Sequence, residues 1–256
     1  MALCLAARRR EISHADVDRA KMLVEPGVTG VFLAYKVSAS AKQVTSSERE
    51  HAKQELKEVL SSHCNSVLVD TYITRGFAAG SDVLLRLHTK EPAAAQSFVL
   101  DFAKTALGQR LEPTEGLVGV TKGLNYITKD DSAELNAALF QMPYSKGPPK
   151  YAIVVPIKKS AAWWNLPQEK RRGMLEEHTQ VTRAYLPSVK RKLYHSTGLC
   201  DADFITYFET EDLGTFNALM IALARVEENT HHVRWGSPTI VATFATTDAL
   251  VDALLV

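Results

Sequence analysis

The sequence of 256 residues predicts an α+β protein in which one order of elements, β-α-β-β-α-β, is used twice. Strand-like runs alternate with amphipathic helical stretches in each half of the chain. Between the halves, residues 129–150 include the turn-rich segment Tyr-Ser-Lys-Gly-Pro-Pro at 144–149, which predicts a linker. The composition, 46% hydrophobic and 23% charged, is that of a globular protein long enough for each half to bury a core.

The first half is predicted to contain four strands and two helices. The helix over residues 46–61 has aliphatic side chains at helical spacing behind a Ser-Ser-Glu start. The helix over residues 91–107 begins at a Glu-Pro pair and ends before Gly108. The predicted strands cover residues 31–37, 66–76, 82–88 and 117–120.

The second half repeats this order. Pro167 stands at the entrance of a helix predicted over residues 168–189, where a missing N–H costs little. A further helix over residues 212–229 has apolar side chains along one face. The predicted strands cover residues 151–158, 191–196, 203–209 and 238–244.

Two successive β-α-β-β-α-β units predict tandem ferredoxin-like domains of the dimeric α+β barrel type. The expected boundaries are an N-terminal extension over 1–20, a first domain over 21–128, a linker over 129–150 and a second domain over 151–256. Helices would cover one face of each sheet, and the other face must also be buried. A large apolar cofactor could therefore lie between a sheet and its helices, or between the two sheets.

Composition and missing motifs exclude several classes of function. With 30 Lys and Arg against 29 Asp and Glu, the net charge of +1 argues against nucleic acid as a partner. No run of about 18 apolar residues occurs, so we expect no membrane span. Three cysteines without C-x-x-C spacing do not suggest a zinc site. The apolar start precedes Arg8-Arg9-Arg10, the reverse of the order in a secretory signal, so we expect a signal peptide to be absent or truncated in this chain.

His178 is the strongest candidate for a ligand. It shares a face of its predicted helix with Met174, Val181 and Tyr185, where a histidine is more often a hydrogen-bonded core residue than a metal ligand. Its surroundings change that balance, because two tryptophans precede the helix and Arg191 lies in the next strand. A neutral imidazole under an aromatic pocket can hold a haem iron, and an arginine opposite it would face an anion. The adjacent pair His231-His232 would point in different directions and is a poor metal site.

From about Asp16 onward the chain resembles the chlorite dismutases, haem b enzymes that split chlorite into chloride and dioxygen. The most specific motif is the run over residues 190–199, Lys-Arg-Lys-Leu-Tyr-His-Ser-Thr-Gly-Leu. Further matching motifs are Ala-Trp-Trp-Asn at 162–165, Glu-His-Thr at 177–179, and the segments 203–210, 233–239 and 121–127.

The resemblance implies one haem b, iron protoporphyrin IX, per chain, with His178 as the proximal iron ligand. Glu228 would accept the other ring proton of His178. Arg191 would be the catalytic residue on the distal side. The other implied positions are Leu193, Thr206 and Phe208 in the distal pocket, Tyr126, Ile127 and Trp163 against the cofactor, and Trp164 and Trp235 as supporting aromatics. Lys104 is a possible propionate partner that the motifs do not align, and Cys200 stands where the family has an acidic residue.

The implied reaction forms the O–O bond at a ferryl iron while Arg191 retains the hypochlorite fragment, because a guanidinium stays charged at working pH. The length matches the branch of the family that forms homopentamers, and the resemblance implies a periplasmic location.

Three other functions compete with this one. Coprohaem decarboxylases share the fold and the proximal histidine but lack the distal arginine, so Arg191 argues against them. A haem-binding protein without turnover would leave Arg191 without a purpose. A general peroxidase would need a distal acid–base residue, which the sequence does not supply.

Overall fold

The computed structural model describes residues 25–39, 43–122 and 147–255. Its first half has the predicted order of elements. The strands are β1 (Thr29–Val37), β2 (Leu68–Ile73), β3 (Val83–Thr89) and β4 (Leu111–Thr121), and the helices are α2 (Ser46–Ser62), α3 (Pro92–Phe102) and the 3-10 turn η1 (Gly108–Arg110). Helix α2 begins with a capping box in which Thr45 and Glu48 bond each other's backbone N–H, as its Ser/Thr-rich start with a following glutamate favours.

The second half repeats that order with three additions. Its strands are β5 (Tyr151–Lys159), β6 (Val189–His195), β7 (Phe204–Thr210), β8 (His232–Trp235) and β9 (Ile240–Phe244). Its helices are α5 (Ala161–Asn165), α6 (Gln168–Arg183), α7 (Leu213–Leu223), the 3-10 segment η2 (Glu227–His231) and α8 (Thr247–Leu254). The short elements α5 and β8 and the C-terminal helix α8 were not predicted from the sequence.

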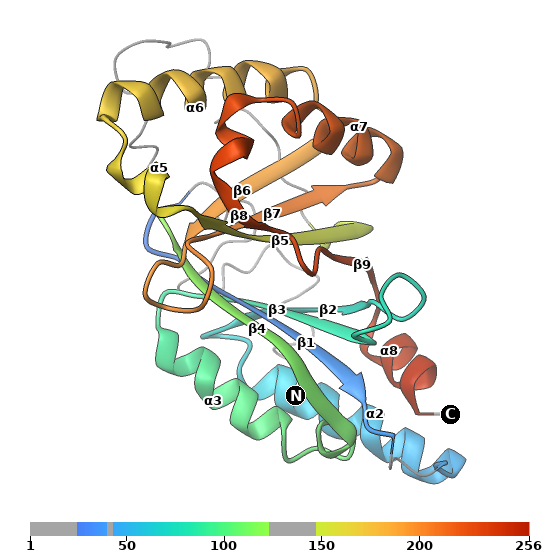
Figure 1. The fold of residues 1–256 in the computed structure, drawn as a ribbon. Helices are drawn as coiled ribbons and strands as arrows, with labels where there is room; N and C mark the ends of the chain where they lie inside the picture. The colour runs from blue at the N-terminus through green and yellow to red at the C-terminus, as the bar shows by residue number, and fades with distance from the viewer. Residues whose placement is uncertain (1–24, 40–42, 123–146, 256) are drawn as a thin grey trace.

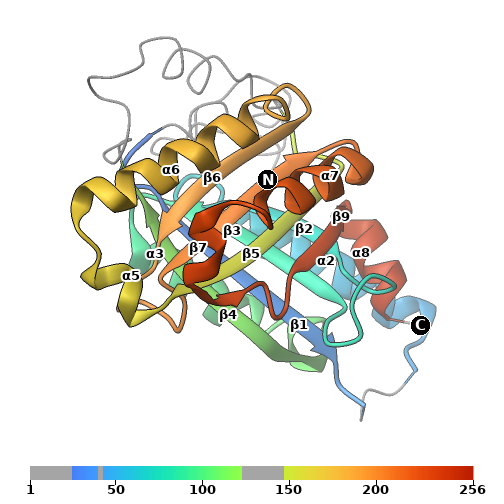
Figure 2. The same ribbon diagram turned by 45° about the horizontal axis from the view of Figure 1, so that its top comes forward.

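Eight antiparallel strands close into a ring. Within the first half the strand order is β4-β1-β3-β2, and within the second half it is β6-β7-β5-β9. Short pairings of β4 with β6 and of β2 with β9 join the two sheets at both edges. Helices α6 and α7 lie outside the second sheet, and α2 and α3 lie outside the first (Figures 1 and 2). The predicted class, tandem ferredoxin-like units of the α+β barrel type, is confirmed.

Side chains fill the space between the two sheets. Because side chains alternate along a strand, one face of each strand points into the barrel and the other toward the helices. Phe32, Tyr72, Tyr194 and Tyr207 are completely buried in the inner cluster. Separate apolar clusters form beneath α2, α3 and α8 and beneath α7. Of the two cofactor locations left open by the sequence, the space between the sheets is therefore occupied by packed side chains.

The C-terminal helix α8 crosses to the first half. Its apolar residues join the core beneath α2, and Asp248 and Asp252 form ion pairs with Lys57 and Lys53 at 2.5 and 2.7 Å. Figure 1 shows α8 beside α2, away from α6 and α7. The last residues of the chain therefore pack on the half that is distant in sequence.

Two predicted helices of the second half end earlier than expected, as does α3 of the first half, which ends at Phe102 and not at residue 107. Helix α6 ends at Arg183 and not at residue 189, because Pro187 lacks a backbone donor and disfavours helical geometry in the residue before it. Helix α7 ends at Leu223 and not at residue 229, because the buried Val226 is extended and the chain turns again as η2. This second correction matters for the site, because Glu228 lies on η2.

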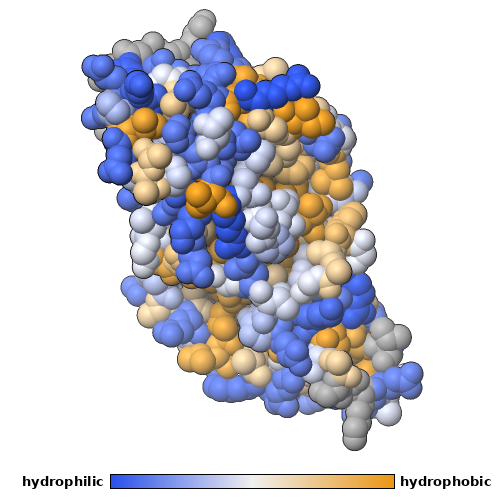
Figure 3. Space-filling view, viewed as in Figure 1, coloured by the Kyte–Doolittle hydropathy of each residue, from blue (hydrophilic) through white to orange (hydrophobic). Residues whose placement is uncertain are grey.

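On the face shown in Figure 3, hydrophobic residues are interspersed with hydrophilic ones. Within the described ranges, no helix combines the length and the hydropathy needed to cross a bilayer.

Candidate functional site

Four of the predicted site residues form one patch on the outer face of the second sheet. Arg191 and Leu193 on β6 pair directly with Phe208 and Thr206 on β7. Directly opposed side chains on neighbouring strands contact one another, so the four share one surface. Phe208 is buried, with its ring 5.1 Å from that of Phe216 on α7, whereas Leu193 is 37% exposed. The patch therefore has a buried apolar side and an accessible side.

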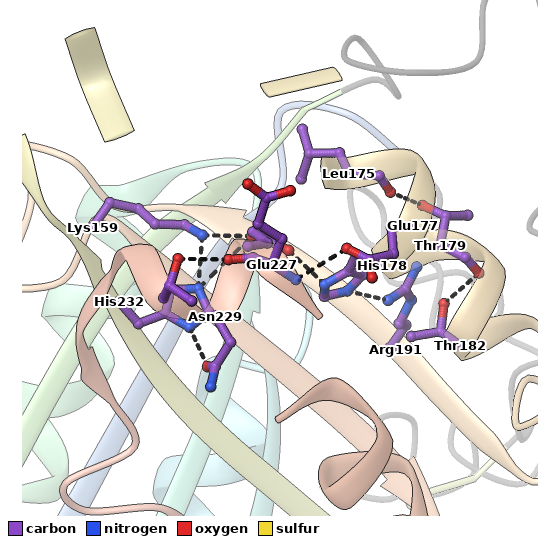
Figure 4. Close-up of polar contacts among 12 residues, drawn as sticks. Lys159, Leu175, Glu177, His178, Thr179, Thr182, Arg191, Glu227, Asn229 and His232 are labelled. Carbon is purple, nitrogen blue, oxygen red and sulfur yellow. Dashed lines mark hydrogen bonds and ion pairs between the residues drawn. The ribbon is translucent and has the colours of Figure 1, made fainter. Parts of the chain in front are cut away.

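His178 projects from α6 onto this patch. Its Nε2 atom lies 3.0 Å from Nη1 of Arg191, which is a hydrogen-bonding distance (Figure 4). Helix α6 directs Met174, Thr179 and Thr182 into the protein, so His178 stands at the border of the buried face. The structure thus brings together the two residues that the sequence singled out, 13 positions apart in the chain.

The second nitrogen of His178 faces a carboxylate. Its Nδ1 lies 2.6 Å from Oε2 of Glu228, which η2 places beside α6. Burial lowers the pKa of His178, Glu228 opposes this shift, and the Arg191 charge reinforces it. A neutral ring with its proton on Nδ1, facing Glu228, leaves a lone pair on Nε2 that accepts a hydrogen bond from Arg191.

Lys159 holds the other oxygen of Glu228. Its ammonium lies 2.5 Å from Glu228 Oε1 and 2.7 Å from Nε2 of His232, whose Nδ1 lies 2.9 Å from Oδ1 of Asn229. Burial would raise the pKa of Glu228, but His178, His232 and Lys159 together lower it well below its ordinary value. Burial lowers the pKa of Lys159 despite the attraction of Glu228. Glu228 is therefore held as a carboxylate between two donors.

Sequence reasoning missed Lys159, His232 and Asn229. Lys159 ends the apolar strand β5 directly after an exposed lysine, so only the alternation of buried and exposed positions could have marked it. His232 belongs to the adjacent histidine pair, which the sequence marks only as a poor metal site. Its position beside Lys159 depends on β8, which the sequence did not predict.

The three predicted tryptophans differ in their burial and in their neighbours. Trp163 is buried, and the Lys159 ammonium lies 4.1 Å from its ring centroid, so it adjoins the Glu228 network. Trp164 is 43% exposed and stacks on Phe204. Trp235 is half-buried, with its ring 5.8 Å from that of His232. The expected cofactor contacts Tyr126 and Ile127 lie outside the described residues.

Lys104 and Cys200 lie apart from His178 in the described structure. Lys104 follows α3 in the first half, is 75% exposed and pairs with Asp101 at 2.8 Å. Cys200 is a half-buried free thiol, 3.7 Å from the carbonyl oxygen of Val118. Neither residue contacts the network around Glu228.

The donor set fits a haem iron better than a free metal ion. Among the described residues, no group of three or more His, Cys, Asp or Glu side chains could hold a metal ion by itself. A haem iron needs only one imidazole from this face, and a metal-binding histidine commonly donates its second N–H to a carboxylate. His178 and Glu228 provide this combination, and Nε2 of His178 faces the sheet on which Arg191 lies.

Comparisons with known proteins point to one family. A family model described as chlorite dismutase matches residues 49–245. The chain is 49% identical to a chlorite dismutase of Ideonella dechloratans, over 94% of this chain and 85% of that protein. A structure of chlorite dismutase from Candidatus Nitrospira defluvii in complex with imidazole matches with a TM-score of 0.87 and 38% identity, covering 94% of this chain and all of that one.

A coproheme decarboxylase of Mycolicibacterium smegmatis is more distant, at 29% identity over 65% of this chain and 68% of that protein. The extent of the family match and the identity to the Ideonella protein agree with the resemblance carried by the sequence motifs. This chain belongs to the chlorite dismutase family.

Proposed function

We propose that this chain is a haem b enzyme that decomposes chlorite to chloride and dioxygen, with His178 as the iron ligand and Arg191 as the catalytic residue. The observation that carries the proposal is the meeting of His178, Glu228 and Arg191 on one sheet face. Membership of the chlorite dismutase family supports the reaction. A bound haem would supply an iron centre that binds chlorite and accepts an oxygen atom from it.

The role of Glu228 follows from its contacts. A carboxylate opposite Nδ1 keeps the ring proton on that nitrogen and makes Nε2 more electron-rich. Lys159 holds Glu228 ionised and fixed in place, because its ammonium occupies the second oxygen. His178 would hold the iron through Nε2, the atom that accepts the hydrogen bond from Arg191 in this structure.

Arg191 would bind the anion. A guanidinium keeps its charge at any working pH and offers several donors, so it can hold chlorite and then the hypochlorite fragment. Phe208 and Leu193 give this charge an apolar setting in which the contact is stronger than in water. Retention of the fragment beside the centre favours its consumption before it can escape.

Oxygen release tests the proposal directly. Chlorite would be added to haem-loaded wild type, Arg191→Ala and Arg172→Ala on a Clark electrode. Arg172 is the matched control, because it lies on the exposed face of the same helix as His178, beside Glu176. We expect near-stoichiometric oxygen from wild type and Arg172→Ala, and a rate lower by about a hundredfold in Arg191→Ala.

Equal rates in all three proteins would reject the role of Arg191. No oxygen from verified wild-type holoprotein would reject the reaction, and coprohaem would then be the substrate to try. The homopentamer implied by the family resemblance is part of the same proposal. Light scattering of the 28.3 kDa chain would test it, and a mass other than five times that of one chain would reject it.

A further inference from the structure

Helix α6 contacts η2 at two adjacent positions. His178 faces the Glu228 carboxylate, and the residue before it, Glu177, accepts a hydrogen bond at Oε2 from the backbone N–H of Glu227, at 3.0 Å. Figure 4 shows Glu177 and His178 on α6 directed toward the segment that carries Glu227. Two neighbouring residues of one element therefore hold two neighbouring residues of the other.

The backbone N–H of Glu227 needs such a partner. It opens a 3-10 segment, where the first N–H groups have no acceptor within the segment. Val226 precedes it and provides no side-chain cap. The Glu177 carboxylate supplies the missing acceptor from a different element, and its negative charge suits the N-terminal end of a helical segment.

His178 and Lys159 hold the two oxygens of the Glu228 carboxylate, and the Glu177 contact fixes the backbone of the segment that carries it. We propose that Glu177 is a positioning residue for the His178–Glu228 pair, acting through the backbone of Glu227. This inference rests on the proposed role of His178 as iron ligand. Glu177 does not touch the imidazole in this arrangement; it keeps Glu228 where Nδ1 can donate to it.

The chain offers a matched control. Glu176 precedes Glu177 on the same helix, is also exposed, and bonds to Arg172 within α6. No contact joins Glu176 to η2 among the described residues. Glu176→Ala therefore removes the same charge from the same helix without affecting the cap. Glu177→Gln removes the charge but retains a side-chain oxygen that accepts a hydrogen bond.

The test uses the haem-loaded proteins and two readouts other than turnover. The first is the iron–histidine stretching frequency of the ferrous protein by resonance Raman spectroscopy, which reports the electron density on the proximal imidazole. The second is the rate of haem loss to an excess of apomyoglobin. Glu228→Gln serves as the positive control, because it removes the carboxylate itself.

We expect Glu177→Ala to lower the stretching frequency in the same direction as Glu228→Gln, by less, and to accelerate haem loss about threefold. Glu177→Gln and Glu176→Ala should match wild type in both readouts. The inference is overturned if Glu177→Ala matches wild type, if Glu176→Ala has the same effect, or if Glu177→Gln is as impaired as Glu177→Ala. If Glu228→Gln also leaves both readouts unchanged, the proposed proximal pair is itself wrong.

Discussion

Arg86 of the first half and Glu209 of the second half meet inside the closed barrel, with Nη1 of the arginine 2.7 Å from Oε1 of the glutamate. Arg86 also bonds Asp70, and the Tyr207 hydroxyl donates to the same Glu209 oxygen at 2.8 Å. All of these side chains are buried. Glu209 follows Phe208 directly, so this ionic cluster lies behind the strand that carries part of the proposed site.

Arg86→Met should strongly destabilise the protein. The substitution leaves Asp70 and Glu209 buried without their counter-charge, and loss of one partner of a buried ion pair costs about 3–5 kcal/mol. Urea unfolding of the haem-free protein would measure the loss. Lys104→Ala is the control, because its ion pair with Asp101 is exposed and should contribute little. Equal stability of the two variants would show that the cluster does not hold the halves together.

Gly119→Ala should loosen the seam between the two sheets. A Cβ at Gly119 would lie 2.6 Å from Oγ of Ser196 and 2.7 Å from Cβ of Tyr194, beside the short β4–β6 pairing. Overpacking of this kind costs about 1–3 kcal/mol. The control is Gly116→Ala on the same strand, whose Cβ would lie 3.7 Å from Leu33. Thermal unfolding should show a lower midpoint for Gly119→Ala alone, and an equal decrease in both variants would contradict this account.

Lys192→Met should stabilise the protein at pH 7 and lose that advantage at alkaline pH. Burial lowers the pKa of Lys192 from 10.5 to about 8. Below pH 8 the lysine is charged in the folded and the unfolded chain, so folding bears the cost of burying the charge. Between pH 8 and 10.5 only the unfolded chain keeps the proton, so the stability of wild type rises relative to the variant.

Denaturant titrations of wild type and Lys192→Met at pH 7, 8.5 and 10 would measure how the difference between their free energies of unfolding narrows as the pH rises. Lys158→Met is the control, because Lys158 is exposed on β5. The difference in free energy of unfolding between Lys158→Met and wild type should not narrow in the way expected for Lys192→Met. A constant difference between wild type and Lys192→Met across the three pH values would show that burial does not shift the titration of Lys192.

The sequence motifs singled out His178 and Arg191, which the structure brings together, but not the contacts around them. His178 and Arg191 stood out because an aromatic and basic setting around one histidine is rare. Glu228 came from the family resemblance, and its predicted helix was wrong, because α7 ends at Leu223. Lys159 contacts His232, which lies 73 positions away in the chain. Glu177 contacts the backbone of Glu227, which lies 50 positions away. No pattern within a short stretch of the sequence identifies such partners.

The sequence by itself determined the two β-α-β-β-α-β units, the amphipathic faces of their helices and the family to which the chain belongs. These features depend on residue periodicity and on motifs within short windows, where local geometry dominates. Only the tertiary structure decided that β4 and β6, and β2 and β9, join the halves into a barrel, and that α8 returns to the first half. Strand register and buried charge pairing depend on residues far apart in the chain, and their energies arise only when both partners are brought together.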